Sequence, residues 1–283
     1  MSQQIIATAP QPMAPFRWKK FFSMENRYLA PAFITCILIV GQLSFGFLES
    51  YKKTGAAILA SLITELILGW IYLGKRPILA SAYISGISVG ILVRSPAFWP
   101  YAVCAVVSIM SKYVLRVNGK HIWNPSNFSI SVLLFLAPET VAALSIQWGN
   151  YLLPMIVIWV LGSIIIYRLH RFHITATYVA SFIALSYVRS LITGSPWLSE
   201  VAPLTGPMYQ LFIFFMITDP KTTVKSKKWQ TVVAAMVAVV EMILRLDHVV
   251  YAPFYALFLV GPVAFLIENW FSTRRAVPAQ VPA

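Results

Sequence analysis

Ten long stretches of apolar, almost uncharged residues constrain this chain more than any other feature. They fill most of its 283 residues, of which 59% are hydrophobic and 11% charged. A soluble domain cannot bury that much apolar surface, whereas a helix of about 20 apolar residues is long enough to span a bilayer. We therefore predict an all-α, polytopic membrane protein with about ten transmembrane helices. The expected spans are roughly 29–48, 55–74, 78–94, 99–117, 125–144, 150–169, 174–192, 203–219, 229–246 and 250–271.

The lysines and arginines provide a separate test of this count. If the N-terminus is cytoplasmic and the chain crosses ten times, the cytoplasmic segments hold 17 of the 22 basic residues. Such an excess of basic residues is typical of cytoplasmic loops. Both termini are therefore expected on the cytoplasmic side. The predicted organisation is a tail at 1–27, a single transmembrane domain at 28–272 and a second tail at 273–283.

The net charge of +13 does not indicate nucleic acid, because no soluble basic domain is present to bind it. Basic loops beside anionic lipid explain the charge better, so the lipid bilayer is the expected partner. The two cysteines, Cys36 and Cys104, lie inside apolar stretches and indicate neither a disulfide nor a metal cluster. The histidines lack metal-ligand spacing, and we predict no metal site.

Part of the second half of the chain resembles part of the first half. The sequence RPILASAYISGISVGILVRS at 76–95 aligns with RFHITATYVASFIALSYVRS at 171–190, an offset of 95 residues. Both segments begin with Arg and end with Arg-Ser. The same offset carries Asn124-Pro125 onto Asp219-Pro220 without a gap.

We therefore predict an internal repeat with units at about 55–145 and 150–246. Transporter-type folds are often built from such units, and their sites lie where broken helices meet at the repeat interface. The units are parallel if all ten stretches cross the membrane. They are inverted if the fifth stretch dips in and returns, and the sequence leaves both arrangements open.

Asn124-Pro125 and Asp219-Pro220 are the expected helix breaks. Asn or Asp followed by Pro is a favoured helix start, and a helix start presents free N–H groups and a partial positive charge. Two such starts can hold an anion, the polar edge of a flavin or, through side-chain oxygens, a cation. Ordinary helix capping is the alternative interpretation. The predicted cofactor-binding residues are Asn124, Asn127, Asp219, Thr222 and Thr223.

Two glutamates lie within predicted spans. Glu241 has Arg245 four residues later, which predicts an ion pair on one helix face. Glu65 has no partner nearby in sequence, so Glu65 and Asp219 are the candidates for an ion path, with a hydrogen bond between helices as the alternative for Glu65.

Gly86 to Gly90 matches two motifs. It fits the GxSxG pattern of hydrolases, but that motif needs a strand-to-helix turn, and here it lies within an apolar span. The same glycines form a GxxxG pattern, which is typical of closely packed membrane helices. We therefore predict helix packing, not a nucleophile.

Several segments resemble one known family. It is the RnfD/NqrB family, whose members are membrane components of the Rnf electron-transport complex and of the sodium-translocating NADH:quinone reductase. The similarity covers roughly residues 55–270, and Phe215–Pro220 resembles the family's Phe-Met-Ala-Thr-Asp-Pro motif. The other matching segments are Ser81–Gly86, Pro96, Trp99, Ser111-Lys112 and Asn118–Pro125, the last of which resembles an Asn-Ile-Phe-Asn-Pro-type motif.

This resemblance implies a component of a bacterial membrane redox complex in the cytoplasmic membrane, which acts with partner subunits. Family members carry flavin, and their electron transfer is coupled to Na⁺ or H⁺ movement. They bear covalent FMN on the threonine of a Ser-Gly-Ala-Thr segment between the fifth and sixth spans. Here that connection is only 138–149, and Thr140 lacks the preceding Ser-Gly-Ala. The resemblance therefore implies non-covalent FMN or riboflavin and no covalent flavin site.

A flavin also needs apolar walls, for which Phe128 and Phe215 are candidates. Two other functions remain open. A cofactor-free transporter or channel fits the predicted duplication and the missing flavin segment. A non-catalytic membrane scaffold is the third interpretation, although a scaffold gains nothing from a carboxylate as costly as Asp219.

Overall fold

The protein is a bundle of helices with two very small sheets. The computed structural model describes residues 26–45, 50–143 and 152–276. The predicted all-α class is confirmed for these residues, and every predicted apolar stretch contains a helix. The helices are α2 (Asn26–Phe45), α3 (Tyr51–Leu73), α4 (Ala80–Leu92), α5 (Trp99–Val114), α6 (Pro125–Leu136), α7 (Leu152–Arg168), α8 (Phe172–Thr193), α9 (Trp197–Val201), α10 (Pro207–Leu211), α11 (Lys227–Leu246) and α12 (Ala252–Ala276).

Short elements connect these helices. A 3-10 turn, η1 (Ala202–Thr205), precedes α10, and a π-helical turn, η2 (Phe212–Met216), continues it. Strand β1 (Val93–Arg94) pairs antiparallel with β4 (Ala142–Ala143), and β2 (Arg116–Val117) pairs with β3 (Lys120–His121). The tails at 1–25 and 277–283 lie outside the described residues.

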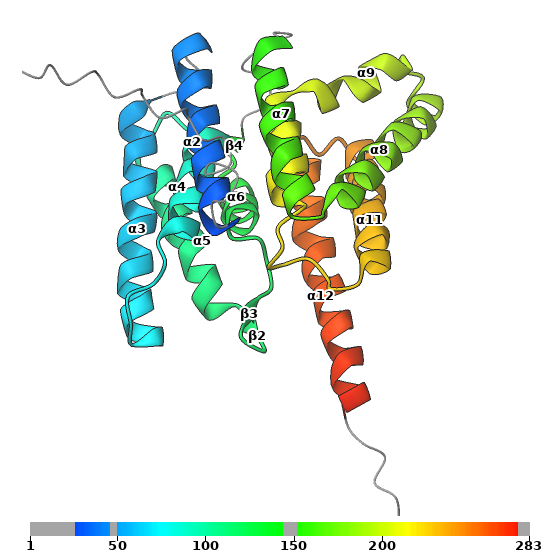
Figure 1. Cartoon of the computed structure of the whole chain (residues 1–283). Coiled ribbons are helices and arrows are strands. Elements are labelled where there is room, and N and C mark those ends of the chain that lie inside the picture. Colours follow the sequence, from blue (N-terminus) through cyan, green and yellow to red (C-terminus); the bar gives the residue numbers. More distant parts are fainter. Residues whose placement is uncertain (1–25, 46–49, 144–151, 277–283) are drawn as a thin grey trace, which may run out of the picture.

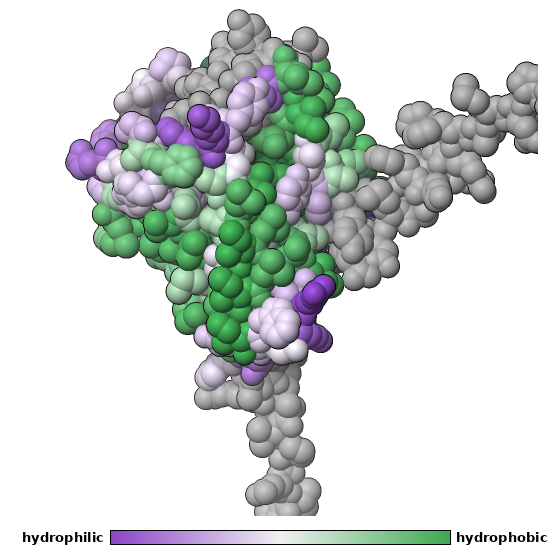
Figure 2. All heavy atoms as spheres, turned by 90° about the vertical axis from the view of Figure 1, so that its left-hand side faces the viewer, coloured by the Kyte–Doolittle hydropathy of each residue, from purple (hydrophilic) through white to green (hydrophobic). Residues whose placement is uncertain are grey.

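Four of the described helices are long and apolar enough to cross a membrane: α3, α8, α11 and the segment Ala252–Phe271 of α12. Their outer faces carry large exposed apolar side chains, such as Leu59, Ile63 and Ile71 on α3. Figure 2 shows the side of the bundle that carries α3 as a broad hydrophobic band, with hydrophilic side chains gathered above and below it. Exposed apolar surface on this scale is expected of a protein surrounded by lipid.

The chain forms two halves that lie side by side (Figure 1). In the first half, α3 packs against α4 and α5, and α5 packs against α6. In the second half, α8 packs against α11, and α11 packs against α12. The two halves meet through α2 against α7 and through α6 against α12.

The connections gather at two ends of the bundle. At one end β1 pairs with β4, and Lys53 Nζ donates a hydrogen bond of 2.6 Å to the carbonyl of Ser95. At the other end Asn118 Nδ2 donates to Asn269 Oδ1 at 2.7 Å, and the Lys225 amide donates to Glu268 Oε1 at 2.8 Å. The second end therefore holds the β2–β3 hairpin, the segment after η2 and the last turns of α12, as Figure 1 shows.

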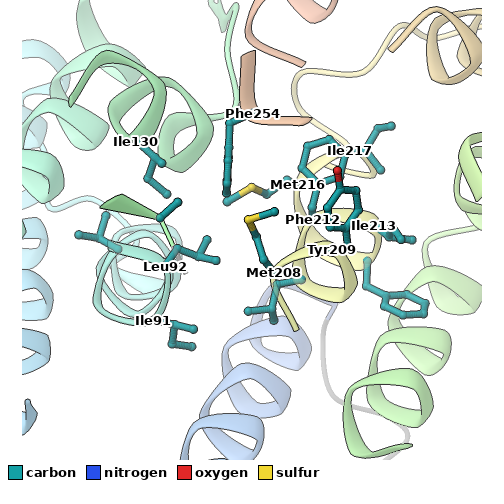
Figure 3. Close-up of a cluster of buried hydrophobic side chains, with 14 of the residues drawn as sticks. Ile91, Leu92, Ile130, Met208, Tyr209, Phe212, Ile213, Met216, Ile217 and Phe254 are labelled. Carbon is teal, nitrogen blue, oxygen red and sulfur yellow. The ribbon is translucent and has the colours of Figure 1, made fainter. Parts of the chain in front are cut away.

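The hydrophobic core runs across the boundary between the halves. Figure 3 shows Ile91, Leu92 and Ile130 of the first half facing Met208 and Met216 of the second. The larger aromatic side chains Tyr209, Phe212 and Phe254 are at most 2% exposed. This apolar contact fixes the positions of α4, α6 and η2, which carry the polar residues described below.

Gly86 and Gly90 lie where α4 approaches α3. A Cβ atom at Gly86 would lie 2.7 Å from the Cα of Ile58, and one at Gly90 would lie 3.1 Å from the Cα of Thr54. A rotamer change cannot relieve these clashes, because the Cα atoms belong to the backbone. The predicted role of the GxxxG pattern in helix packing is confirmed, and the motif lies within a helix and not at a strand-to-helix turn.

We expect Gly86→Ala to lower the free energy of unfolding by about 1–3 kcal/mol, because α3 and α4 must separate to admit the methyl group. Gly55→Ala on α3 is the matched control, because nothing lies within 4 Å of its added Cβ. The control should stabilise the helix by about 0.5–1 kcal/mol. Thermal unfolding of both variants in one detergent measures the difference. Equal stabilities would contradict the packing role of Gly86.

Candidate functional site

The first predicted break is a helix start. Asn124 caps α6: its Oδ1 accepts a hydrogen bond of 3.0 Å from the Asn127 amide, and Pro125 occupies the first helical position. Pro is favoured there because its fixed φ suits a helix and its missing N–H has no partner to lose. The sequence prediction for Asn124-Pro125 is confirmed.

The second break differs from its prediction. The helical segment of η2 ends at Met216, and α11 begins only at Lys227, so Asp219-Pro220 does not start a helix. Instead, Asp219 Oδ1 accepts from the Lys221 amide at 3.1 Å, and the Asp219 carbonyl accepts from the Thr223 amide at 3.2 Å. Asp side chains commonly form such local turns in competition with helix. The second break therefore lacks the free N–H groups and the partial positive charge of a helix start.

The two breaks nevertheless meet. Asn124 Nδ2 donates a hydrogen bond of 3.2 Å to Asp219 Oδ2, although 95 residues separate them. Thr222 Oγ1 donates to the same carboxylate oxygen at 3.3 Å, and Thr223 Oγ1 donates to the Asp219 carbonyl. Asn127 lies one helical turn beyond Asn124. All five predicted cofactor-binding residues therefore lie together.

Charged and titratable side chains surround Asp219. Burial lowers the pKa of His121 to about 4, and the nearby Asp219 carboxylate acts in the opposite direction. His121 is therefore neutral at pH 7. Burial also lowers the pKa of Arg171, again against the effect of Asp219. Lys221 is close enough to His121 to disfavour its protonation. The carboxylate of Asp219 thus lies within a basic environment.

A cavity of about 350 Å³ opens beside Asn124 and Asp219. This volume is at the lower end of the range for small-molecule sites. Its polar side chains include three serines of α4 at positions 81, 85 and 88. Its apolar walls come from α2, α4, α7 and the α10–η2 segment, so it lies between the two halves. The main apolar residues are Ile34, Ile84, Ile91, Leu92, Ile165, Leu211, Phe214 and Phe215.

A second cavity, of about 30 Å³, lies on the other side of Asn124. Asn127, Thr222 and Thr223 line this cavity and not the larger one, whereas Asn124 lines both. The five predicted residues therefore divide between two adjacent cavities. A ligand in the large cavity can reach Asn124 and Asp219 directly.

Phe215 lines the large cavity, as predicted, but Phe128 does not. The Phe128 ring packs against Trp123 and Phe258, with ring centroids 5.4 and 5.7 Å away. Phe128 lies on the face of α6 that meets α12, and that contact holds it away from the cavity. Of the two predicted wall residues, Phe215 alone lines the large cavity.

Glu65 has a partner that its sequence neighbours do not reveal. Lys112 Nζ of α5 donates to Glu65 Oε2 at 2.5 Å, and Tyr113 Oη donates to Oε1 at 3.1 Å. Both charged residues are buried, at 5% and 6% exposure. The two charges lie in the second and fourth predicted apolar stretches, and no local sequence signal links them. The role of Glu65 in an ion path stays a prediction.

Glu241 pairs with Arg245 at 3.0 Å, as predicted. The sequence did not reveal that Tyr178 and Tyr209 also donate hydrogen bonds to Glu241. These bonds join α11 to α8 and to α10. Glu241 is fully buried, and its bonding identifies it as a structural link within the second half.

Comparison with known proteins adds no identification. No protein-family model matches this chain, and a search of curated proteins found no relative. The described residues contain no group of three or more His, Cys, Asp or Glu side chains placed to hold a metal ion. The segment expected to replace the covalent-flavin site is described only as far as residue 143. The resemblance to the RnfD/NqrB family stays a prediction based on the motifs.

Proposed function

We propose that this protein is a membrane redox component that binds a flavin non-covalently in the large cavity. One observation carries the proposal: the two sequence motifs of the resemblance meet at one cavity between the halves, through Asn124 and Asp219. The cavity combines a polar side with apolar and aromatic walls. An isoalloxazine ring needs the same combination, because its pyrimidine edge forms hydrogen bonds and its remaining surface is apolar.

The lining residues suit distinct roles. Asn124 Nδ2 and the α4 serine hydroxyls supply donors for the ring carbonyls and nitrogens, and neutral His121 supplies either a donor or an acceptor. Phe214 and Phe215 supply aromatic surface against the ring. Lys221, at the exposed edge, suits the phosphate of FMN. When bound, a flavin accepts and releases electrons, and partner subunits of a membrane complex would deliver and remove them.

We also propose that the chain crosses the membrane ten times as two inverted units of five helices. The packing of α3 on α5 corresponds to that of α8 on α11, and the packing of α5 on α6 corresponds to that of α11 on α12. An offset of 129 residues takes Leu115-Arg116 onto Leu244-Arg245, and it takes Lys112 onto Glu241. An odd number of crossings in each unit makes the two units inverted.

The predicted offset of 95 residues would instead pair α4 with α8. The packing does not support that pairing, since α4 lies against α3 and α2, whereas α8 lies against α11 and α9. In the proposed arrangement the basic end of the bundle, with the β2–β3 hairpin and the segment after η2, faces the cytoplasm of a bacterial cell.

A transporter without a cofactor is the second candidate function. The specific observation in its favour is the position of the cavity between two halves with matching packing, beside two helix breaks. Secondary transporters bind their substrates at such a place. The three α4 serines and Asn124 in the lining would then suit a small polar solute.

The purified protein should be yellow, with a flavin absorption spectrum in mild detergent, because the cavity provides both polar and apolar contacts for the ring. Denaturation in SDS followed by gel filtration should release the flavin from the chain, since we propose no covalent bond. Chromatography of the released compound distinguishes FMN from riboflavin.

Two variants locate the flavin. Ser85→Phe should fill the cavity and reduce the bound flavin, because Ser85 lines it and is buried. Ser199→Phe is the control, because Ser199 is exposed on α9 and does not line the cavity. A colourless protein that moves a solute into liposomes would favour the transporter. Flavin that stays on the chain in SDS would contradict non-covalent binding.

A further inference from the structure

Exposed basic residues gather where α3 and α5 end. The two helices end side by side, because the ring of Tyr72 in the last turn of α3 lies 5.7 Å from the ring of Tyr113 in the last turn of α5. Lys75 and Arg76 follow the end of α3, Arg116 follows the end of α5, and all three are exposed. These three residues form a basic rim at one end of the bundle.

The basic rim takes part in no ion pair within the part of the chain that the structure describes. Those pairs join Lys112 to Glu65, Arg189 to Glu200 and Arg245 to Glu241. The ends of α3 and α5 each carry a partial negative charge of roughly half an elementary charge, which opposes an anion. Three full positive charges exceed this opposition, so the rim attracts an anion.

Arg116 is held in place by its neighbours. Its guanidinium group lies over the Tyr113 ring, 5.5 Å from the ring centroid. The ring is fixed in turn, because Tyr113 Oη donates a hydrogen bond of 3.1 Å to Glu65 Oε1. On the backbone, Arg116 pairs with His121 in the β2–β3 hairpin. A guanidinium held over a ring keeps its N–H groups available, and their planar arrangement suits two oxygens of a phosphate.

Exposed apolar side chains adjoin the basic rim. On α3, Ile67 and Ile71 are 53% and 69% exposed, and on α5, Met110 and Val114 are 44% and 58% exposed. Residues four apart lie on one face of a helix, so each helix presents an apolar strip that leads to the rim. Figure 2 shows the apolar band on the α3 side of the bundle ending at its lower edge in hydrophilic side chains.

We propose that the basic rim and the two apolar strips bind an anionic phospholipid. Its phosphate lies against Arg116 and the other rim residues, and its acyl chains lie along the strips. Phosphatidylcholine matches the strips, but its headgroup has no net negative charge for the rim. An acidic protein matches the rim, but it leaves the strips uncovered. This inference rests on the proposed membrane-spanning arrangement and not on flavin.

Native mass spectrometry of the purified full-length protein, titrated with dioleoyl phosphatidylglycerol or dioleoyl phosphatidylcholine, tests this inference. The wild type should bind phosphatidylglycerol more tightly by about tenfold or more. Arg116→Gln should weaken that affinity by about fivefold, which corresponds to about 1 kcal/mol for one basic residue at an anionic membrane surface. Lys52→Gln is the matched control, because it removes one exposed charge at the other end of α3. The control should bind phosphatidylglycerol as the wild type does.

Lys75→Gln is a second variant in case Arg116→Gln disturbs the β2–β3 hairpin. Glycerol 3-phosphate should not displace the lipid, because it lacks the acyl chains; displacement would reduce the site to a phosphate site and overturn the inference. Equal affinity for the two lipids, or an equal loss in Lys52→Gln and Arg116→Gln, would also overturn it. A second copy of the chain in place of retained lipid would identify a dimer interface instead. The titration uses flavin-free and flavin-containing protein, so its result is separate from the flavin proposal.

Discussion

Replacing Lys112 with Met should lower the free energy of unfolding by about 3–5 kcal/mol, because it leaves the Glu65 carboxylate buried without its partner. The two charges are 2.5 Å apart, and their side chains are each 7% exposed. Met has a similar length and removes only the charge and its hydrogen bonds. Denaturant or thermal unfolding of the purified protein in detergent measures the loss. Lys120→Met is the control, because Lys120 is an exposed residue of β3.

The double variant Glu65→Gln, Lys112→Met separates the lost pair from the stranded charge. Gln keeps an oxygen that can accept the hydrogen bond from Tyr113 Oη, which is 3.1 Å long in the wild type. Removing both charges should therefore restore about 1–3 kcal/mol relative to Lys112→Met alone. A double variant no more stable than the single one would contradict a direct charge pair.

The Lys112→Met variant also tests the predicted role of Glu65 in an ion path. A carboxylate held permanently by Lys112 is a link between α3 and α5, and it cannot readily exchange an ion. If Lys112→Met costs less than about 1 kcal/mol, Glu65 does not depend on the lysine as a partner, and an ion-path role gains support. If Lys112→Met costs about 3–5 kcal/mol, Asp219 is the remaining ion-path candidate of the two that the sequence indicated.

The sequence predicted the helices well because long apolar stretches and their bounding prolines are local signals. Asn124-Pro125 starts a helix because capping and the fixed φ of Pro both act within one turn. Asp219-Pro220 carries the same local signal but starts no helix. The threonines at 222 and 223 bond back to Asp219, and this turn competes successfully with helix until Ser226.

The partners of buried charges could not be predicted, because they depend on how distant helices pack. Nothing near Glu65 in the sequence points to Lys112, which lies 47 residues away on α5, two helices after α3. The pairing of Glu241 with Arg245 was predictable because it lies within one helix. Its two tyrosine donors were not, since Tyr178 and Tyr209 arrive on other segments.

The sequence placed five polar residues at one site, but it could not divide them between two cavities. That division depends on the side chain of Asn124, which lies between the cavities and bonds to Asp219. It also depends on the Phe254 carbonyl of α12, which takes the amide hydrogen of Asn127. Neither contact has a sequence signature, because each joins the first half of the chain to the second.

Asp219→Asn should lower flavin retention by about tenfold or more, while leaving membrane insertion intact. The change removes the carboxylate that the Lys221 amide, Asn124 and Thr222 all bond. A hydrogen bond to a charged group contributes about 1.5–3 kcal/mol, and about 1.4 kcal/mol corresponds to a tenfold change in affinity. Bound flavin per chain is measured on the purified protein, and the amount of protein in the membrane fraction measures insertion. Asp247→Asn is the control, because Asp247 is the other aspartate in the chain and is exposed.

The pattern of losses separates the three functions. Loss of bound flavin supports a redox protein whose flavin site includes Asp219. Loss of solute movement into liposomes, in a protein that never held flavin, supports a transporter. If Asp219→Asn retains flavin and moves solute as Asp247→Asn does, Asp219 only forms a turn between η2 and α11, and the scaffold interpretation is favoured. The carboxylate then persists at the membrane edge because three hydrogen bonds to its oxygens compensate its cost without any ligand.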